Sequence, residues 1–213
     1  MEQLREHKLF LRHDKCEFEH TQIKYLGLVV AHGSITMDPI KVAGVAEWPM
    51  PKTKKEVQLF LGFANFYHRF IEGFSHHAQP LFDLMKKDVP WVWNDNQQKA
   101  FNELKNRITS SPVLRFADDS LLFHVEADSS DFATGAVLLQ QSPEDNKWHP
   151  VSFYSKSLND VEWNYEIHDK EMLVIIRALE EWHHFREGSQ HKFEIWTRRI
   201  KITRSFSCDA QTT

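Results

Sequence analysis

The sequence contains little cysteine, glycine or proline. Its two cysteines, Cys16 and Cys208, are far apart and neither belongs to a Cys-x-x-Cys pair. A disulfide framework is thereby excluded, and an intracellular setting, cytoplasmic or nuclear, is favoured. With only 7 Gly and 8 Pro in 213 residues, a disordered linker protein is also disfavoured. No apolar run approaches the roughly 20 residues of a membrane span, and no signal peptide precedes the first charges. We therefore expect a soluble, mostly folded chain.

A strong excess of charge of either sign is also absent. The formal net charge is -4, and residues 1–110 carry 15 Lys and Arg against 13 Asp and Glu. Binding to nucleic acid usually needs a basic surface, because neutralised phosphates supply most of the non-specific affinity. Here basic residues gather only in short patches, which solvated helix or loop faces also explain: Lys52, Lys54, Lys55, Lys86 and Lys87.

Helical patterns dominate residues 38–111. Asp38 and Pro39 predict a helix start, and that helix should end before Pro49. Thr53 followed by Glu56 is a capping box, and the apolar residues after it recur at helical spacing. We expect a short helix near Pro80–Met85 and another after Asn94. Before them, the runs KCEF and IKYLGLVV each read as a strand, and residues 35–37 are expected to pair back.

The pattern changes to strands from Leu121. Three apolar-alternating segments, LLFHVEAD, ATGAVLLQQ and KWHPVSFYSKS, precede a long helix near Tyr165–Phe185 and a fourth strand at Lys192–Thr197. Asp128 ends the first of these strands, and Glu171 lies on the helix. Two carboxylates that meet on one sheet-and-helix layer are suitable ligands for Mg²⁺, which prefers hard oxygen donors.

The run FHVEADSSDFATGAVLLQ, with HPVSFYSKSLNDVEWNYEIHDKEMLVIIRALEEWHHF, resembles the ribonuclease H domain of gypsy-class LTR-retrotransposon polyproteins. The upstream runs IKYLGLVV, MDPIKVAGVAEWPMPKTKKEVQLFLGFANFYHRFIEGFS and WVWNDNQQKAFNELKNRITSSPVL resemble the end of the reverse transcriptase in the same polyproteins. The resemblance covers about residues 4–197, in the family's order, so chance similarity is improbable.

The resemblance implies an α+β architecture in which a short hairpin and a helical thumb and connection precede an incomplete ribonuclease H-like domain with the order β-β-β-α-β. We expect the end of the palm at 1–37, thumb and connection at 38–111, the ribonuclease H-like domain at 112–197 and a divergent tail at 198–213. In the family, a hairpin near Leu26 and Gly27 grips the primer end. Gly27 is explained equally well as a glycine that allows a bulge or a close approach of the backbone.

The resemblance also implies a metal site. Asp128 and Glu171 match two carboxylates of a site that holds Mg²⁺, or Mn²⁺ in its place, and these two residues are the expected catalytic and metal-binding set. Where the family has Thr-Asp-His after the fourth strand, this chain reads Thr197-Arg198-Arg199. A guanidinium is permanently charged and ligates no metal, so Arg198 leaves the set incomplete and argues against metal binding by this chain.

Other candidate residues have simpler explanations. Asp131 suits a turn or cap, and Glu126 suits a salt bridge or solvent. The pairs His76-His77 and His183-His184 lack the spacing of a zinc site, because adjacent residues on a helix do not face one another.

The expected function is that of a fragment of a reverse transcriptase and ribonuclease H, whose parent is an RNA-directed DNA polymerase and an endonuclease of RNA–DNA hybrids. The expected partners are an RNA–DNA hybrid or primer–template duplex and the rest of the polyprotein. The chain has no Tyr-x-Asp-Asp polymerase loop and no third carboxylate, so we expect it to be inactive alone. The alternatives are a non-catalytic binding module, a weakly active metal-dependent nuclease and a genomic relic.

Overall fold

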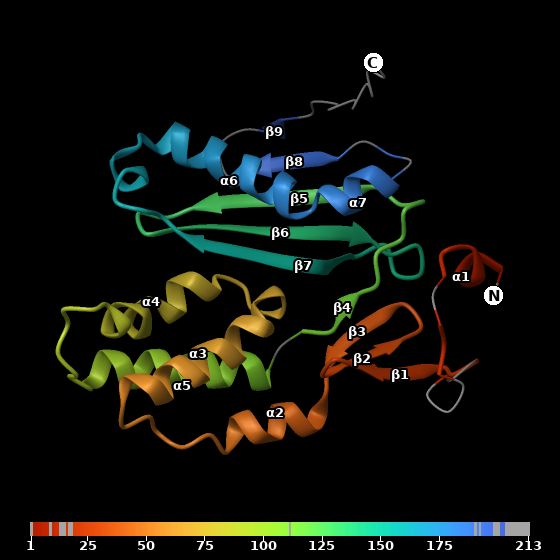
Figure 1. Cartoon of the computed structure of the whole chain (residues 1–213). Helices are drawn as coiled ribbons and strands as arrows, with labels where there is room; N and C mark the ends of the chain where they lie inside the picture. Colours follow the sequence, from red (N-terminus) through yellow and green to blue (C-terminus); the bar gives the residue numbers. More distant parts are fainter. Residues whose placement is uncertain are drawn as a thin grey trace.

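The computed structural model describes residues 2–8, 10–12, 16, 19–110, 112–189, 191, 193–197 and 201–202. It contains two sheets and several helices, which pack in layers (Figure 1). The first sheet has the order β1-β2-β3-β4 and the second the order β7-β6-β5-β8-β9. The mixed architecture agrees with the expected α+β class, and the order β-β-β-α-β is present in the second sheet with its helix α6.

The N-terminal part combines a short helix with a small antiparallel sheet. Its elements are α1 (Glu2–Glu6), β1 (Gln22–Tyr25), β2 (Leu28–Ala31), β3 (Ser34–Met37) and, much later in the chain, β4 (Leu114–Arg115). The run IKYLGLVV was expected to be one strand, and this was wrong: it forms β1 and β2, joined by a two-residue turn. Of the other expected strand, KCEF, only Cys16 belongs to the described residues.

The helical part begins at a helix capped by Asp38, with Pro39 as its first residue, and ends near residue 109. Its elements are α2 (Pro39–Ala46), α3 (Lys54–Phe66), η2 (His68–Phe70), α4 (Phe74–Met85) and α5 (Asp95–Thr109). The Thr53 Oγ1 accepts the Glu56 N–H at 3.3 Å, as predicted, but the Glu56 carboxylate accepts the N–H of Lys52, at 2.8 Å, and not that of the N-cap residue Thr53. Only one half of the predicted capping box therefore forms. The expected short helix at residue 80 is longer than predicted: α4 begins six residues earlier, and Pro80 lies inside it.

The second sheet is a mixed sheet with one helix along it. Its elements are β5 (Phe123–Ser129), β6 (Ala133–Gln141), β7 (Trp148–Ser157), η3 (Glu162–Asn164), α6 (Ile167–Glu181), α7 (His183–Gly188), β8 (Glu194–Thr197) and β9 (Lys201–Ile202). The single long helix expected at residues 165–185 is in fact two helices, α6 and α7, with the break at Trp182, whose ring is buried against the core.

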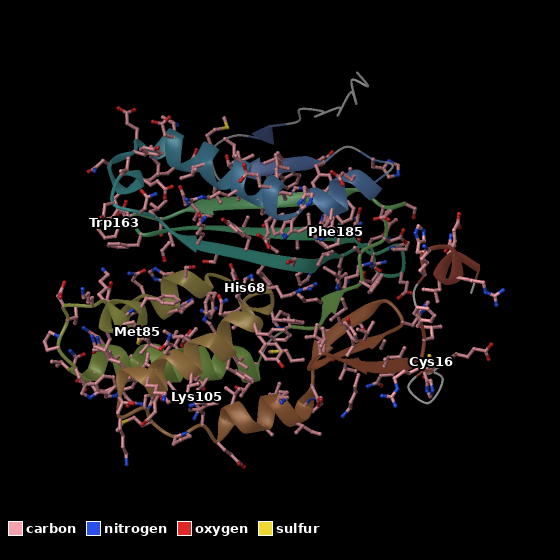
Figure 2. All side chains as sticks on the ribbon, viewed as in Figure 1. Cys16, His68, Met85, Lys105, Trp163 and Phe185 are labelled. Carbon is pink, nitrogen blue, oxygen red and sulfur yellow. The ribbon has the colours of Figure 1, made fainter. Side chains whose placement is uncertain are left out.

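Two apolar cores lie on opposite faces of the second sheet. One contains the buried face of α6 with Val125 and Ala127 of β5. The other contains α3, α4 and α5, and Phe153 of β7 packs against it. α6 therefore covers one face of the sheet (Figure 1). On the other face, α4 and η2 pack against β7, and we call this contact the seam. His68 of η2 lies near it (Figure 2).

Two polar contacts also cross this seam. The Ser75 N–H donates to Ser155 Oγ at 3.0 Å, and the Ser157 Oγ–H donates to Gln79 Oε1 at 3.2 Å. The expected boundary at 111 and 112 stays a prediction, although Leu114 of β4 is buried in the core of the helical part.

Candidate functional site

Asp128 lies near the end of β5, with its side chain exposed. Because side chains alternate along a strand, Val125 and Ala127 point into the α6 core while Glu126 and Asp128 take the opposite face. The turn that follows is built as the sequence predicts: Ser130 Oγ accepts the Ala133 N–H at 3.1 Å and donates to the Ala133 carbonyl at 3.0 Å. β5 and β6 are thus joined tightly just beyond Asp128.

Glu171 lies in the second turn of α6 and is half-buried. It precedes the buried residues Val174 and Ile175 by three and four positions, so it shares the side of the helix that packs on the sheet. The arrowheads of β5 and β8 point to the same end of the sheet, and α6 begins at that end (Figure 1). The end of β5, which carries Asp128, and the start of α6, which carries Glu171, therefore lie at the same end of the sheet (Figure 1).

The third position of the expected site follows β8 in the sequence. β8 pairs in parallel with β5, and the last pair in the described residues is Ala127 with Thr197. Arg198, the residue at the third position, lies outside the described residues, as do Arg199 and the tail from 203.

A cavity of about 500 Å³ lies on the Asp128 face of the sheet, between the strands and the start of α4. Its lining includes three carboxylates, two imidazoles and two large rings: Glu72, Glu126, Asp128, His76, His77, Tyr154 and Trp196. Burial, followed by the positive charge of Arg107, lowers the pKa of His77. At neutral pH, His77 is therefore mostly uncharged.

The donors in the described part of the chain do not fit a two-metal site. Within the described residues, no group of three or more His, Cys, Asp or Glu side chains is arranged to hold a metal ion. Two adjacent divalent ions repel one another, and their charge must be balanced by several carboxylates. Asp128 and Glu171 alone are too few. RNase H-like domains generally use divalent metals, but the arrangement here supports no reaction step through such ions.

The other candidates have structural roles. Glu126 is exposed, and its carboxylate lies 3.6 Å from His124, a buried residue of the same strand, with which it forms an ion pair only when the imidazole is protonated. Asp131 is exposed in the β5–β6 turn. His76 and His77 contact one another edge to face, with ring centroids 5.4 Å apart, and His183 and His184 do the same at 5.6 Å.

A second candidate surface lies on the helical part, far along the sequence from Asp128. The exposed side of α3 carries polar and apolar residues at helical spacing, including Gln58, Leu59, Gly62, Asn65 and Phe66. An added Cβ at Gly62 would meet no atom within 4 Å, so the helix is bare at that point. The helical spacing of the apolar residues predicts the buried side of this helix. The residues between them, which lie on the opposite side, are the signal in the sequence that could have indicated this surface.

The chain resembles known proteins over nearly its whole length. Residues 93–195 match the family model "RNase H-like domain found in reverse transcriptase". The Transposon Tf2-3 and Tf2-4 polyproteins of Schizosaccharomyces pombe are 38% identical over 197 residues, or 92% of this chain. The chain spans only 15% of the length of those relatives.

Solved structures show the same fold. The foamy viral protease-reverse transcriptase in complex with RNA/DNA hybrid matches 86% of this chain and 24% of its own, with a TM-score of 0.72 and 17% identity. The dRH form of that protein in complex with ds DNA matches 84% of this chain and 31% of its own, with a TM-score of 0.70 and 17% identity. The chain therefore belongs, over residues 93–195, to the RNase H-like domains found in reverse transcriptases, within a stretch homologous to retrotransposon polyproteins.

Proposed function

We propose that this chain binds a primer–template duplex, an RNA–DNA hybrid included, and does not cleave it on its own. The observation that carries the proposal is that the described residues offer no group of three His, Cys, Asp or Glu side chains arranged to hold a metal ion. The sequence has Arg198 where the family has its third carboxylate. A guanidinium ligates no metal ion and attracts phosphate, which favours binding over hydrolysis.

The roles of the two carboxylates follow from this reading. Asp128 and Glu171 are the remaining members of a metal-binding set and are proposed to be insufficient without a third carboxylate. DNA synthesis is not proposed either, because the chain contains no Tyr-x-Asp-Asp motif.

The exposed side of α3 is the proposed duplex surface. It is almost uncharged apart from Lys55, and it combines the amide of Gln58 with the exposed ring of Phe66. Amides donate and accept hydrogen bonds, which suits base edges and sugars, whereas lysines attract phosphates from the flanks. Gly62 leaves room between them for close approach of a nucleotide backbone. The rest of the polyprotein is the proposed partner, in an intracellular setting that suits the two widely spaced cysteines.

The test is a titration of a labelled RNA–DNA hybrid with the purified chain at several salt concentrations, with EDTA present so that no metal contributes. We expect an affinity that falls steeply with salt, because each neutralised phosphate releases counterions. A Gln58→Ala variant should weaken binding several-fold. The matched control is Asn106→Ala on α5, which also removes one exposed side-chain amide from a helix. Equal losses in the two variants would refute the proposed surface, and salt-independent binding would refute contact with the phosphates.

The second candidate function is a weak, metal-dependent nuclease. It is favoured by the presence of Asp128 and Glu171 at the same end of the sheet. That alternative predicts slow cleavage of the hybrid in Mn²⁺ or Mg²⁺, and the cleavage must fall when Asp128 is changed to Asn.

A further inference from the structure

A second cavity, of about 430 Å³, lies where the helical part meets the β5–β6 turn. The end of α4 and the segment after it form one wall. Two exposed rings, Phe132 of the β5–β6 turn and Trp163 of η3, form the other, with ring centroids 6.5 Å apart. The lining described for this cavity includes neither Asp128 nor a residue of α3, so it is separate from both surfaces discussed above.

Residues 89–93 run along the first wall as an extended segment. Trp91 and Trp93 are half-buried and stack on one another, with ring centroids 5.8 Å apart, while Val92 between them is 53% exposed. This alternation is that of a β-strand, in which neighbouring side chains point to opposite sides. The two indole rings pack on the core of the helical part, and Val92 lines the cavity.

The backbone of this segment has no strand beside it. Among the described residues, none forms a hydrogen bond with the main chain of Pro90, Trp91, Val92 or Trp93. The Lys54 ammonium donates to the carbonyl of Val89 at 2.6 Å, which holds the start of the segment from the α3 side.

Lys54 also distinguishes the two edges of the segment. The backbone groups of alternate residues point to the same edge of a strand, so Lys54 contacts the edge to which the groups of Val89, Trp91 and Trp93 belong. The opposite edge carries the carbonyl of Pro90 and both backbone groups of Val92. Proline suits such an edge, because its missing N–H leaves no ladder hydrogen bond unmade.

The chemistry of the cavity favours a peptide over a nucleic acid as its ligand. Asp83 and Lys86 are the charged side chains of the described lining, and they pair with one another at 2.8 Å. The cavity therefore offers phosphate no excess of positive charge. Its exposed side chains are apolar, with Phe132 54% and Trp163 43% exposed. An open strand edge beside exposed rings is the arrangement that binds extended peptides, since the main chain gives affinity and the side-chain pocket gives specificity.

We propose that this cavity binds an extended, uncharged peptide segment of a partner protein by strand addition. The Val92 N–H donates to the peptide, and the carbonyls of Pro90 and Val92 accept from it. An aromatic or branched apolar side chain of the peptide packs against Phe132 and Trp163. This inference goes beyond the proposed function and does not depend on it, because no residue of the proposed duplex surface takes part.

The experiment measures binding of a short, blocked, fluorescently labelled peptide that alternates threonine and tyrosine to the full chain, by fluorescence anisotropy. The control peptide has the same side chains with its amides N-methylated, so it cannot donate main-chain hydrogen bonds. Nuclear magnetic resonance follows hydrogen exchange at the amides of Trp91, Val92 and Trp93, with and without the peptide.

Matched variants separate the backbone from the rings. Val92→Pro removes the N–H from the open edge, whereas Val92→Thr keeps the N–H and the branched shape. Phe132→Ala removes one ring of the cavity. Its control is Phe116→Ala, because Phe116 is 51% exposed and lies outside the cavity. Thermal unfolding of every variant is measured in parallel.

We expect the unmodified chain to bind the alternating peptide, and to bind the N-methylated peptide at least about tenfold more weakly. Exchange at the Val92 amide should slow in the complex, while exchange at Trp91 and Trp93 stays unchanged. Val92→Pro and Phe132→Ala should each weaken binding about 5- to 10-fold, and Val92→Thr and Phe116→Ala should change it less than about twofold.

Several results would overturn the proposal. They are no binding of the alternating peptide up to roughly millimolar concentration, equal affinity for the two peptides, and unchanged exchange at the Val92 amide. Displacement of the peptide by a single-stranded oligothymidylate would assign the cavity to nucleic acid instead. If Val92→Pro does not fold, the N-methylated peptide still decides the question, because it is tested on the unmodified chain.

Discussion

Replacing Gly27 with alanine should destabilise the protein by two separable mechanisms. Gly27 has φ of 79°, where any residue with a Cβ is strained by about 1–2 kcal/mol. The new Cβ would also lie 2.7 Å from the Tyr67 hydroxyl oxygen, too close for a real contact. The tyrosine must then move, and loss of the hydrogen bond that its hydroxyl donates to the Gly27 carbonyl at 3.1 Å costs about 0.5–1.5 kcal/mol. The expected total is about 1.5–3.5 kcal/mol.

The two mechanisms can be separated in a Tyr67→Phe background. Without the hydroxyl, the nearest atom of the ring to the new Cβ is 3.8 Å away, which is an ordinary contact. The alanine then costs only the backbone strain of about 1–2 kcal/mol. We therefore expect a coupling of about 1 kcal/mol between the two substitutions.

The assay is urea unfolding followed by far-ultraviolet circular dichroism for the four proteins of the cycle. Gly33→Ala is the matched control, because Gly33 has φ of 71° and an added Cβ there meets nothing within 4 Å. It should cost only the backbone strain and show no coupling to Tyr67. Equal costs of Gly27→Ala in both backgrounds, or a cost no larger than that of Gly33→Ala, would refute the reasoning.

Three further predictions follow from particular residues. Phe60→Ala should lower the free energy of unfolding by about 3–5 kcal/mol in a urea titration, because the ring is fully buried against Phe101. Burial raises the pKa of Tyr154 to about 12, so an ultraviolet titration should show the phenol of this residue ionising late, and stability should fall as pH rises from about 10 through 12. Gly62→Ala should raise the free energy of unfolding by about 0.5–1 kcal/mol, because alanine favours a helix more than glycine does. The same substitution should weaken hybrid binding, and unchanged binding would show that Gly62 is not part of the proposed surface.

Local signals explain which elements the sequence predicted well. The start of α3 follows from Thr53 and Glu56, which lie three residues apart and need no distant partner. β5, β6 and β7 follow from their alternating apolar residues. The local pattern did not divide IKYLGLVV into β1 and β2, because the turn carries Leu26, which gives none of the usual turn signals, and a hairpin there was expected only from the family resemblance.

The candidate site could be predicted only in part. Asp128 and Glu171 were found through the resemblance to a family, and the strand and helix that carry them were correct. The cavity beside Asp128 could not be predicted, because it depends on α4 packing against β7. The contact between Ser75 and Ser155 joins positions 80 residues apart, and no local pattern encodes it.

The most direct test of the account is single-turnover cleavage of an end-labelled RNA–DNA hybrid by the purified, folded chain in Mg²⁺ and in Mn²⁺, beside Asp128→Asn. We predict binding of the hybrid without cleavage, and identical intact RNA with both proteins. Cleavage by the unmodified chain that disappears in Asp128→Asn would contradict the account, because it would show that Asp128 and Glu171 suffice for the nuclease reaction without a third carboxylate.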